Sequence, residues 1–265
     1  LFCIVAYADF PCDYLKFSNI DKANQISKGN GAVIAVIDWS FATEDKELKP
    51  FYYKPKSFTK SNLNKDVQPW HGHWMTQIAH SVAPEAKIII IEAVENCSEK
   101  IDKQTCWKNN VDKALKYAAD NGAVAVSISH QQIKDYKARN NAINYAKKKG
   151  TLFIDIHYSG NNENVLIPSG SFKMIEHSDV NVCEYTPFGY KELKAGGKMP
   201  VGWDGEGLSN TAPIVLGVTA LVKSVNPKLT GLDIKKIIID TSKNVDGKKV
   251  VDALAAVEKA KTLQK

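Results

Sequence analysis

The sequence predicts an α/β fold in which a mostly parallel β-sheet lies between helices on both faces, in three layers. Short apolar runs without interruption recur along the chain, and such runs are typical of strands that are buried on both faces. Segments with apolar residues at helical spacing separate these runs. Strands that alternate with helices form βαβ units, which build a parallel sheet.

Four apolar runs give the expected strands. The first ends at Asp38, and each run has the length of a buried strand. They lie in residues 31–38, 86–94, 123–129 and 151–156.

Six segments predict helices. The first has Met75, Ile78 and Val82 on one face and stops at Pro84, and two later segments end at a glycine. The segment that starts at residue 211 is apolar nearly all round, as expected for a central buried helix. The helices are expected in residues 71–83, 111–121, 140–149, 211–224, 229–242 and 250–261. Residues 160–206 are rich in Gly, Pro and Asn, which indicates loops and short irregular strands.

The composition favours one globular domain. The 265 residues are 44% apolar and 24% charged, and we find no internal repeat or linker. The net charge is +6, but the lysines are spread along the chain, so we expect a solvated basic surface and no nucleic-acid partner. The sequence shows no run of about 18 apolar residues, so we expect no membrane span. We also expect a monomer.

The start of the sequence and its cysteines favour export. Residues 1–8 are apolar and end in Ala-Tyr-Ala, which resembles the end of a signal peptide; an ordered N-terminal strand or arm is the alternative. We therefore expect a domain over residues 9–265 in a secreted or periplasmic protein. Cys97 and Cys106 flank a polar loop and could form a local disulfide, whereas Cys12 and Cys183 could pair or stay free.

Three polar residues stand at the ends of predicted elements. Taken singly, Asp38 reads as a turn residue, His71 as a capping or packing residue and Ser209 as a helix N-cap. Together they supply what acyl transfer by serine needs: a nucleophile, a base that takes its proton, and a carboxylate that orients the base. A helix that begins near Ser209 adds N–H groups for the oxyanion.

Over roughly residues 28–260 the sequence resembles the subtilisin-like serine peptidases, or subtilases. "AVIAVIDWS" resembles the strand that carries the family's Asp, "HGHWMTQIAHSVAPEA" its His helix, and "GLSNTAP" its Gly-Thr-Ser-Met-Ala-(Ser/Thr)-Pro motif. "NGAVAVSIS" resembles the strand that ends in Ser-Leu-Gly at the substrate-binding edge. The resemblance implies a serine endopeptidase with Asp38, His71 and Ser209 as its triad and a peptide or protein as its substrate.

Several neighbours of the triad depart from the family pattern. The two residues after Asp38 and the residues at positions 73 and 74 are larger than those of the family pattern, and a Leu replaces the Thr before Ser209. Tryptophans among these residues either narrow the site or simply pack. The departures are Trp39-Ser40, His73-Trp74, Leu208 and Ser129-His130-Gln131, and Trp203 is a further candidate for shaping the site.

The resemblance also implies residues for the substrate and the oxyanion. Residues 125–131 would pair with an extended substrate as an added strand, with Ser127, Ser129 and His130 as contacts. Asn161, which follows a glycine, is our choice for the oxyanion donor, and Ser159 is the alternative.

We expect no metal and no cofactor. His71 and His73 are two residues apart on a predicted helix and so do not share a face, which argues against a site with Asp155 and His157. Structural calcium is common in the family, but the sequence offers no compelling loop for it. The altered neighbours leave one alternative function, a catalytically silent protein of the same fold that binds a peptide or protein partner.

Overall fold

The computed structural model describes residues 12–60, 62–63, 71–93, 103–129, 136–172, 177–186 and 207–264. The predicted residues 1–8, Cys97, His130, Gln131 and Trp203 lie outside this part, as does the side chain of Cys106.

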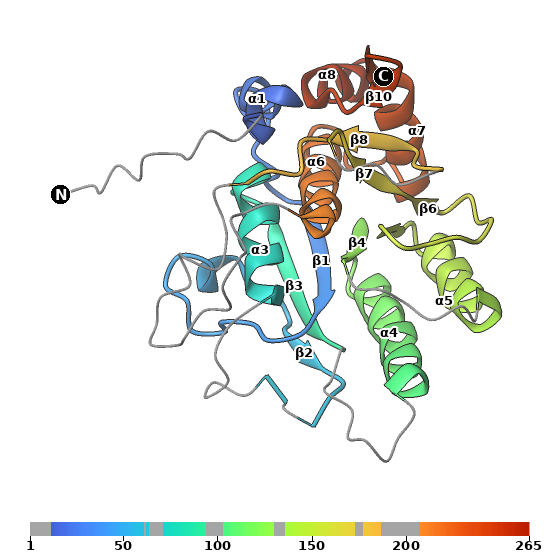
Figure 1. The fold of residues 1–265 in the computed structure, drawn as a ribbon. Helices are drawn as coiled ribbons and strands as arrows, with labels where there is room; N and C mark the ends of the chain where they lie inside the picture. Colours follow the sequence, from blue (N-terminus) through green and yellow to red (C-terminus); the bar gives the residue numbers. More distant parts are fainter. Residues whose placement is uncertain are drawn as a thin grey trace.

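The central sheet has six strands, all parallel, in the order β2-β3-β1-β4-β5-β6 (Figure 1). β1 and β3 are continuous Val, Ile and Ala runs because both faces of these strands are covered. The strands are β1 (Val33–Asp38), β2 (Lys56–Ser57), β3 (Lys87–Glu92), β4 (Ala125–Ile128), β5 (Leu152–Asp155) and β6 (Val165–Leu166). The fold class that the sequence predicts is confirmed.

Helices cover both faces of this sheet (Figure 1). One face packs against α3 (His71–Val82), α6 (Thr211–Val225), α7 (Gly231–Thr241) and α8 (Ala253–Thr262). The other packs against α4 (Lys103–Asp120) and α5 (Tyr136–Lys148). The remaining helices of the described part are short: α1 (Tyr14–Phe17), α2 (Ile20–Ala23), η1 (Lys49–Phe51) and η2 (Leu208–Asn210).

α6 is the central helix, and it packs against α3, α8 and β4. In the part of the chain that the structure describes, residues 208–225 are the one stretch with the length and apolar character of a membrane span. This stretch is 72% buried inside the molecule, as the core helix of a globular domain would be.

A second, smaller sheet has the order β7-β8-β10-β9 and mixes parallel with antiparallel pairs. Its strands are β7 (Pro168–Gly170), β8 (Val180–Val182), β9 (Lys243–Val245) and β10 (Lys248–Val250). The short strands expected within residues 160–206 are thus found where that region is described. The β9–β10 hairpin was not predicted, although its Asp246-Gly247 turn, with both residues at positive φ, is a typical hairpin signal.

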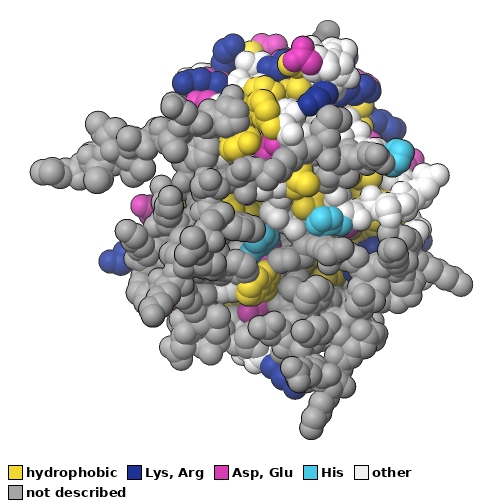
Figure 2. All heavy atoms as spheres, viewed as in Figure 1, with side chains coloured by type: hydrophobic (Ala, Val, Ile, Leu, Met, Phe, Trp, Pro, Cys, Tyr) yellow, Lys and Arg dark blue, Asp and Glu magenta, His cyan; other side chains and the backbone are white. Residues whose placement is uncertain are grey.

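A disulfide joins Cys12 to Cys183, across a separation of 171 residues, with the Cα atoms 6.2 Å apart. It links the segment before α1 to the end of β8, and so decides between the two alternatives left open for these cysteines. On the face shown in Figure 2, the described Lys and Arg side chains lie around the rim rather than in one block, in keeping with the even spread of lysines along the sequence.

Candidate active site

Asp38 is the last residue of β1, and its side chain is fully buried. The backbone N–H of Trp39 donates to its Oδ1 at 2.8 Å. A buried carboxylate is costly unless hydrogen-bond donors surround it, so Asp38 needs partners of this kind. Its second partner comes from α3.

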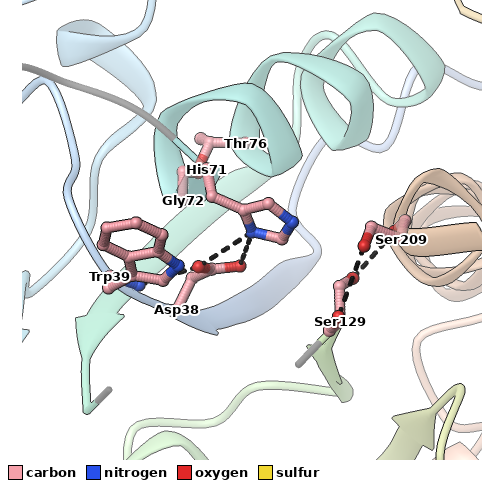
Figure 3. Close-up of polar contacts among 7 residues, drawn as sticks. All are labelled: Asp38, Trp39, His71, Gly72, Thr76, Ser129 and Ser209. Atoms are coloured by element: carbon pink, nitrogen blue, oxygen red, sulfur yellow. Dashed lines mark hydrogen bonds and ion pairs between the residues drawn. The ribbon is translucent and has the colours of Figure 1, made fainter. Parts of the chain in front are cut away.

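His71 is the first residue of α3, and its side chain is 5% exposed. Its Nδ1 lies 3.0 Å and 2.9 Å from the two carboxylate oxygens of Asp38 (Figure 3). A carboxylate oxygen accepts, so Nδ1 carries a proton, and Nε2 of the neutral ring is left as the acceptor. The arrangement therefore suits His71 to take a proton at Nε2.

The start of α3 is tied to the loop after β1. The N–H of Gly72 donates to the Trp39 carbonyl at 2.9 Å, and the N–H of His73 donates to the Ser40 carbonyl at 3.3 Å. These bonds satisfy N–H groups that a helix start leaves open. They also hold His71 opposite the end of β1.

Ser209 lies in the 3-10 turn η2 (Leu208–Asn210), directly before α6. The N-cap of α6 is Asn210, which makes no side-chain cap bond, so the interpretation of Ser209 as an N-cap is wrong. The extra turn moves Ser209 out of the cap position. Its side chain is partly exposed, as a nucleophile must be.

Ser209 is held against the end of β4. Its hydroxyl donates to the Ser129 carbonyl at 3.4 Å, and the Ser129 hydroxyl donates to the Ser209 carbonyl at 2.8 Å. Figure 3 shows His71 with Nδ1 toward Asp38 and its opposite edge turned toward the side where Ser209 lies. The described hydrogen bond of the Ser209 hydroxyl goes to Ser129 and not to His71.

The expected substrate edge begins later than the sequence suggested. Residues 125–128 pair with β1 on one side and β5 on the other, so the prediction of an open edge is wrong for them. Ser127 is mid-strand and 1% exposed, and so has no surface for a substrate. A single sequence does not show strand order, which is why this was missed. Ser129 lies just past the paired residues, and His130 is outside the described part.

The two oxyanion candidates follow β5 on an exposed turn. Ser159 and Asn161 are both exposed, and between them Gly160 packs against Tyr158, whose hydroxyl donates to Asn140 Oδ1 at 2.7 Å. A Cβ at Gly160 would lie 2.6 Å from that hydroxyl. The glycine is needed for this close approach, and the choice between Ser159 and Asn161 stays a prediction.

Neither a family model nor a curated protein sequence matches the chain. Solved structures do match. The MycP3 protease of the type VII (ESX-3) secretion system superposes with a TM-score of 0.75 at 18% identity, over 92% of this chain and 87% of its own.

The chain has the subtilisin-like fold.

Two further solved structures have the same fold. Subtilase cytotoxin SubAB matches with a TM-score of 0.72 at 14% identity, over 94% of this chain and 96% of its own. Fervidolysin from Fervidobacterium pennivorans, a keratinolytic enzyme related to subtilisin, matches at 0.70 and 17% identity, over 89% of this chain and 44% of its own. At these identities the likeness establishes the fold.

Within this subtilisin-like fold, two histidines near the start of α3 have different partners. His73 is buried and has its Nε2 3.4 Å from Asp45, whereas His71 faces Asp38. Burial lowers the pKa of His73, and the nearby Asp45 opposes this shift. Among the described residues, no group of three or more His, Cys, Asp or Glu side chains is placed to hold a metal ion.

Asp155 is a second buried carboxylate at a strand end. Burial raises its pKa from 3.8 to about 7, although the N–H of His157, which donates to Oδ1 at 2.8 Å, and the charge of Arg139 both act to lower it. Asp155 lies among the residues toward α4 and α5, because it alternates with Ile154 of the opposite core. It therefore sits on the other side of the sheet from His71.

The tryptophans beside the site differ in burial. Trp74 is 1% exposed and packs in the core, with its ring 6.1 Å from that of His71 in an edge-on arrangement. Trp39 is only partly buried. The sequence left open whether these tryptophans narrow the site or pack in the core, and Trp74 packs in the core.

One residue that bears on the site was missed. Asn210 is fully buried beside Ser209, and its side chain donates to the Glu184 carbonyl at 2.7 Å. The signal was present, since an amide follows the serine directly where an apolar helix is about to begin.

Proposed function

We propose that this protein is a serine endopeptidase that hydrolyses peptide bonds with Ser209, His71 and Asp38. The observation that carries the proposal is the buried pair of Asp38 and His71, with Nδ1 2.9 Å from the carboxylate, and a partly exposed Ser209 on the side of the His71 ring away from Asp38 (Figure 3). Asp38 ends β1, His71 begins α3 and Ser209 lies in η2, and α3 contacts both β1 and η2. The subtilisin-like fold supports the proposal, since the proteins it resembles include proteases.

In the proposed reaction, the Ser209 hydroxyl attacks the scissile carbonyl carbon while His71 Nε2 takes its proton. The imidazolium then gives this proton to the leaving amine, and an acyl-enzyme remains on Ser209. Water repeats the sequence and releases the acid. Asp38 holds the Nδ1–H tautomer of His71 and stabilises the positive charge on the ring.

The oxyanion needs hydrogen-bond donors placed where its charge develops. We assign one donor to the backbone N–H of Ser209, at the start of α6, and the second to Asn161, with Ser159 as the alternative. Loss of such a side-chain donor lowers turnover by about 100- to 1000-fold. Substitution of Asn161 and of Ser159 in turn therefore shows which of the two is the donor.

We also assign the protein to an oxidising compartment outside the cytoplasm. The Cys12–Cys183 disulfide supports this assignment, because structural disulfides persist mainly in exported proteins. The proposed substrates are extended peptides or proteins that reach the site past Ser129, beyond the paired part of β4.

Cleavage of a peptide library tests the proposal. We expect the intact protein to cleave internal peptide bonds and Ser209→Ala to abolish cleavage. Ser224→Ala is the matched control, since Ser224 lies at the far end of α6, the helix that follows Ser209, and its hydroxyl donates to the Leu221 carbonyl. Activity that survives Ser209→Ala would sink the assignment of the nucleophile.

One observation favours a second candidate, a silent protein that binds peptides. The Ser209 hydroxyl donates to Ser129 at 3.4 Å instead of to His71, so it must turn before it can react. This candidate predicts that the wild-type chain and Ser209→Ala bind the same peptides and that neither cleaves them.

A further inference from the structure

Asn210 occupies an unusual place for an amide. It is 0% exposed, at the end of the turn that carries Ser209 and at the start of the apolar helix α6. Its Nδ2 donates to the Glu184 carbonyl at 2.7 Å and lies 3.5 Å from Thr186 Oγ1. Burial of an amide costs free energy unless its hydrogen bonds are made, and the bonds of Nδ2 offset part of this cost for Asn210.

The segment that accepts from Asn210 is itself anchored. Glu184 is 0% exposed, and its carboxylate accepts from the N–H of Phe172. Cys183, one residue earlier, is bonded to Cys12 and follows β8 directly. Asn210 therefore ties the turn to a part of the molecule that a sheet and a disulfide already hold.

The same turn is held from the sheet side as well. The Ser129 hydroxyl donates at 2.8 Å to the carbonyl of Ser209, which belongs to the peptide group that joins Ser209 to Asn210. The N–H of Asn210 donates to the Gly207 carbonyl at 3.0 Å. With Ser129 on one side and Glu184 on the other, the turn has little freedom to rotate.

We infer that Asn210 is a positioning residue, whose amide locks the turn so that Ser209 stays beside His71. This inference rests on the proposed function of Ser209. In the subtilisin-like motif Gly-Thr-Ser-Met-Ala the corresponding residue is Met, whose side chain has no N–H to donate. The anchor is thus a property of this chain, at the position where its motif departs from the family.

The rate at which a fluorophosphonate labels Ser209 tests the inference. We expect Asn210→Ala to slow labelling by about 10- to 100-fold, because a shift on the order of 1 Å in a reacting group costs that much. In peptide cleavage kcat should fall while KM stays unchanged. Asn210→Leu, which keeps about the same side-chain volume but has no side-chain donor, should slow labelling in the same way.

Asn226→Ala is the matched control. Asn226 is 2% exposed at the other end of α6, and its Nδ2 donates to the Ala260 carbonyl at 3.1 Å. Both substitutions remove a buried amide from the same helix, so both lower the denaturation midpoint. We expect only Asn210→Ala to change the labelling rate of the folded protein.

Hydrogen exchange of the backbone separates this inference from the proposed function. We expect Asn210→Ala to speed exchange in residues 207–212 and Asn226→Ala to leave it unchanged there. If Asn210→Ala is labelled at the same rate as the wild-type protein and its backbone exchanges at the same rate, the inference is overturned. If the wild-type protein is not labelled at all, the proposed function of Ser209 fails, and unchanged exchange in Asn210→Ala would then overturn the anchor as well.

Discussion

Asp38 and Asp155 are both buried carboxylates at the ends of parallel strands, but their surroundings differ. Asp38 accepts from a backbone N–H and faces the imidazole of His71, which can hold a positive charge. Asp155 accepts from the N–H of His157, and burial still raises its pKa to about 7. The first environment suits a carboxylate that orients a base, whereas the second favours the neutral acid.

Substitution of Asp38 tests the first of these roles. An amide at position 38 can donate to Nδ1 and so stabilises the wrong tautomer of His71. We expect Asp38→Asn to lower kcat for peptide cleavage by about 10⁴-fold. Asp45→Asn is the control, because Asp45 is 25% exposed and pairs with His73. Equal losses in the two variants would contradict the assignment.

Asp155 gives a prediction for the pH dependence of stability. Since its folded-state pKa is raised from 3.8 to about 7, the folded protein holds a proton between these values that the unfolded chain releases. This contribution to stability is present at low pH and is lost as pH rises to about 7 and above. It amounts to on the order of 4 kcal/mol.

Asp155→Asn removes this dependence, because Asn does not ionise and its Oδ1 can still accept from the N–H of His157. We expect the variant to melt at a higher temperature than the wild type at pH 8 and at a similar temperature at pH 4. A difference in melting temperature that is the same at both pH values would show that Asp155 is not neutral in the folded protein at low pH.

The helix α3 places His71, and a glycine controls where the helix begins. A Cβ at Gly72 would lie 2.6 Å from the Trp39 carbonyl oxygen and 2.8 Å from the Phe41 ring. Only a residue without a side chain permits this approach of α3 to the loop after β1. The glycine therefore couples the start of α3 to Asp38.

Gly72→Ala should push the start of α3 away from β1 and separate His71 from Asp38. We expect a loss of stability of about 1–3 kcal/mol and a loss of activity beyond what the folded fraction explains. Gly217→Ala is the matched control, since its Cβ would lie 2.5 Å from Val82, at the opposite end of α3 from His71. Activity per folded molecule should fall only in Gly72→Ala, and an equal fall in both would refute the coupling.

The elements that the sequence predicted correctly are those with a strong period. β1, β3, α3 and α6 bury long apolar faces. The spacing of their apolar residues is therefore enough to predict each element, even when the packing neighbours are unknown. The β9–β10 hairpin and the 3-10 turn of Ser209 are three residues or fewer per element, too short for a period. Strand order, and the bond between Asn210 and Glu184, depend on contacts between distant segments, which no local pattern contains.

Over the whole molecule, the Cys12–Cys183 disulfide closes a long loop that includes α3 and all six strands of the central sheet. Such a cross-link stabilises mainly by restricting the unfolded chain, and loss of a native disulfide costs about 2–5 kcal/mol. The bond also fixes the segment that Asn210 holds.

We expect reduction to lower the denaturation midpoint of the wild-type protein. A Cys12→Ser, Cys183→Ser double variant should have a lower midpoint with or without reductant, which controls for effects of the reductant elsewhere. Urea denaturation, monitored by circular dichroism, measures the midpoints of the wild type and of the double variant. A wild-type midpoint that does not move on reduction would contradict the stabilising role of this disulfide.

The central claim is that Ser209 is a nucleophile activated by His71 and Asp38. Its most direct test is the mass of the intact protein after reaction with a fluorophosphonate, with the modified peptide identified. We predict one adduct per chain, on Ser209, that is lost in Ser209→Ala and strongly slowed in His71→Ala. No adduct on the folded wild-type protein, or an adduct that persists in Ser209→Ala, would contradict the claim.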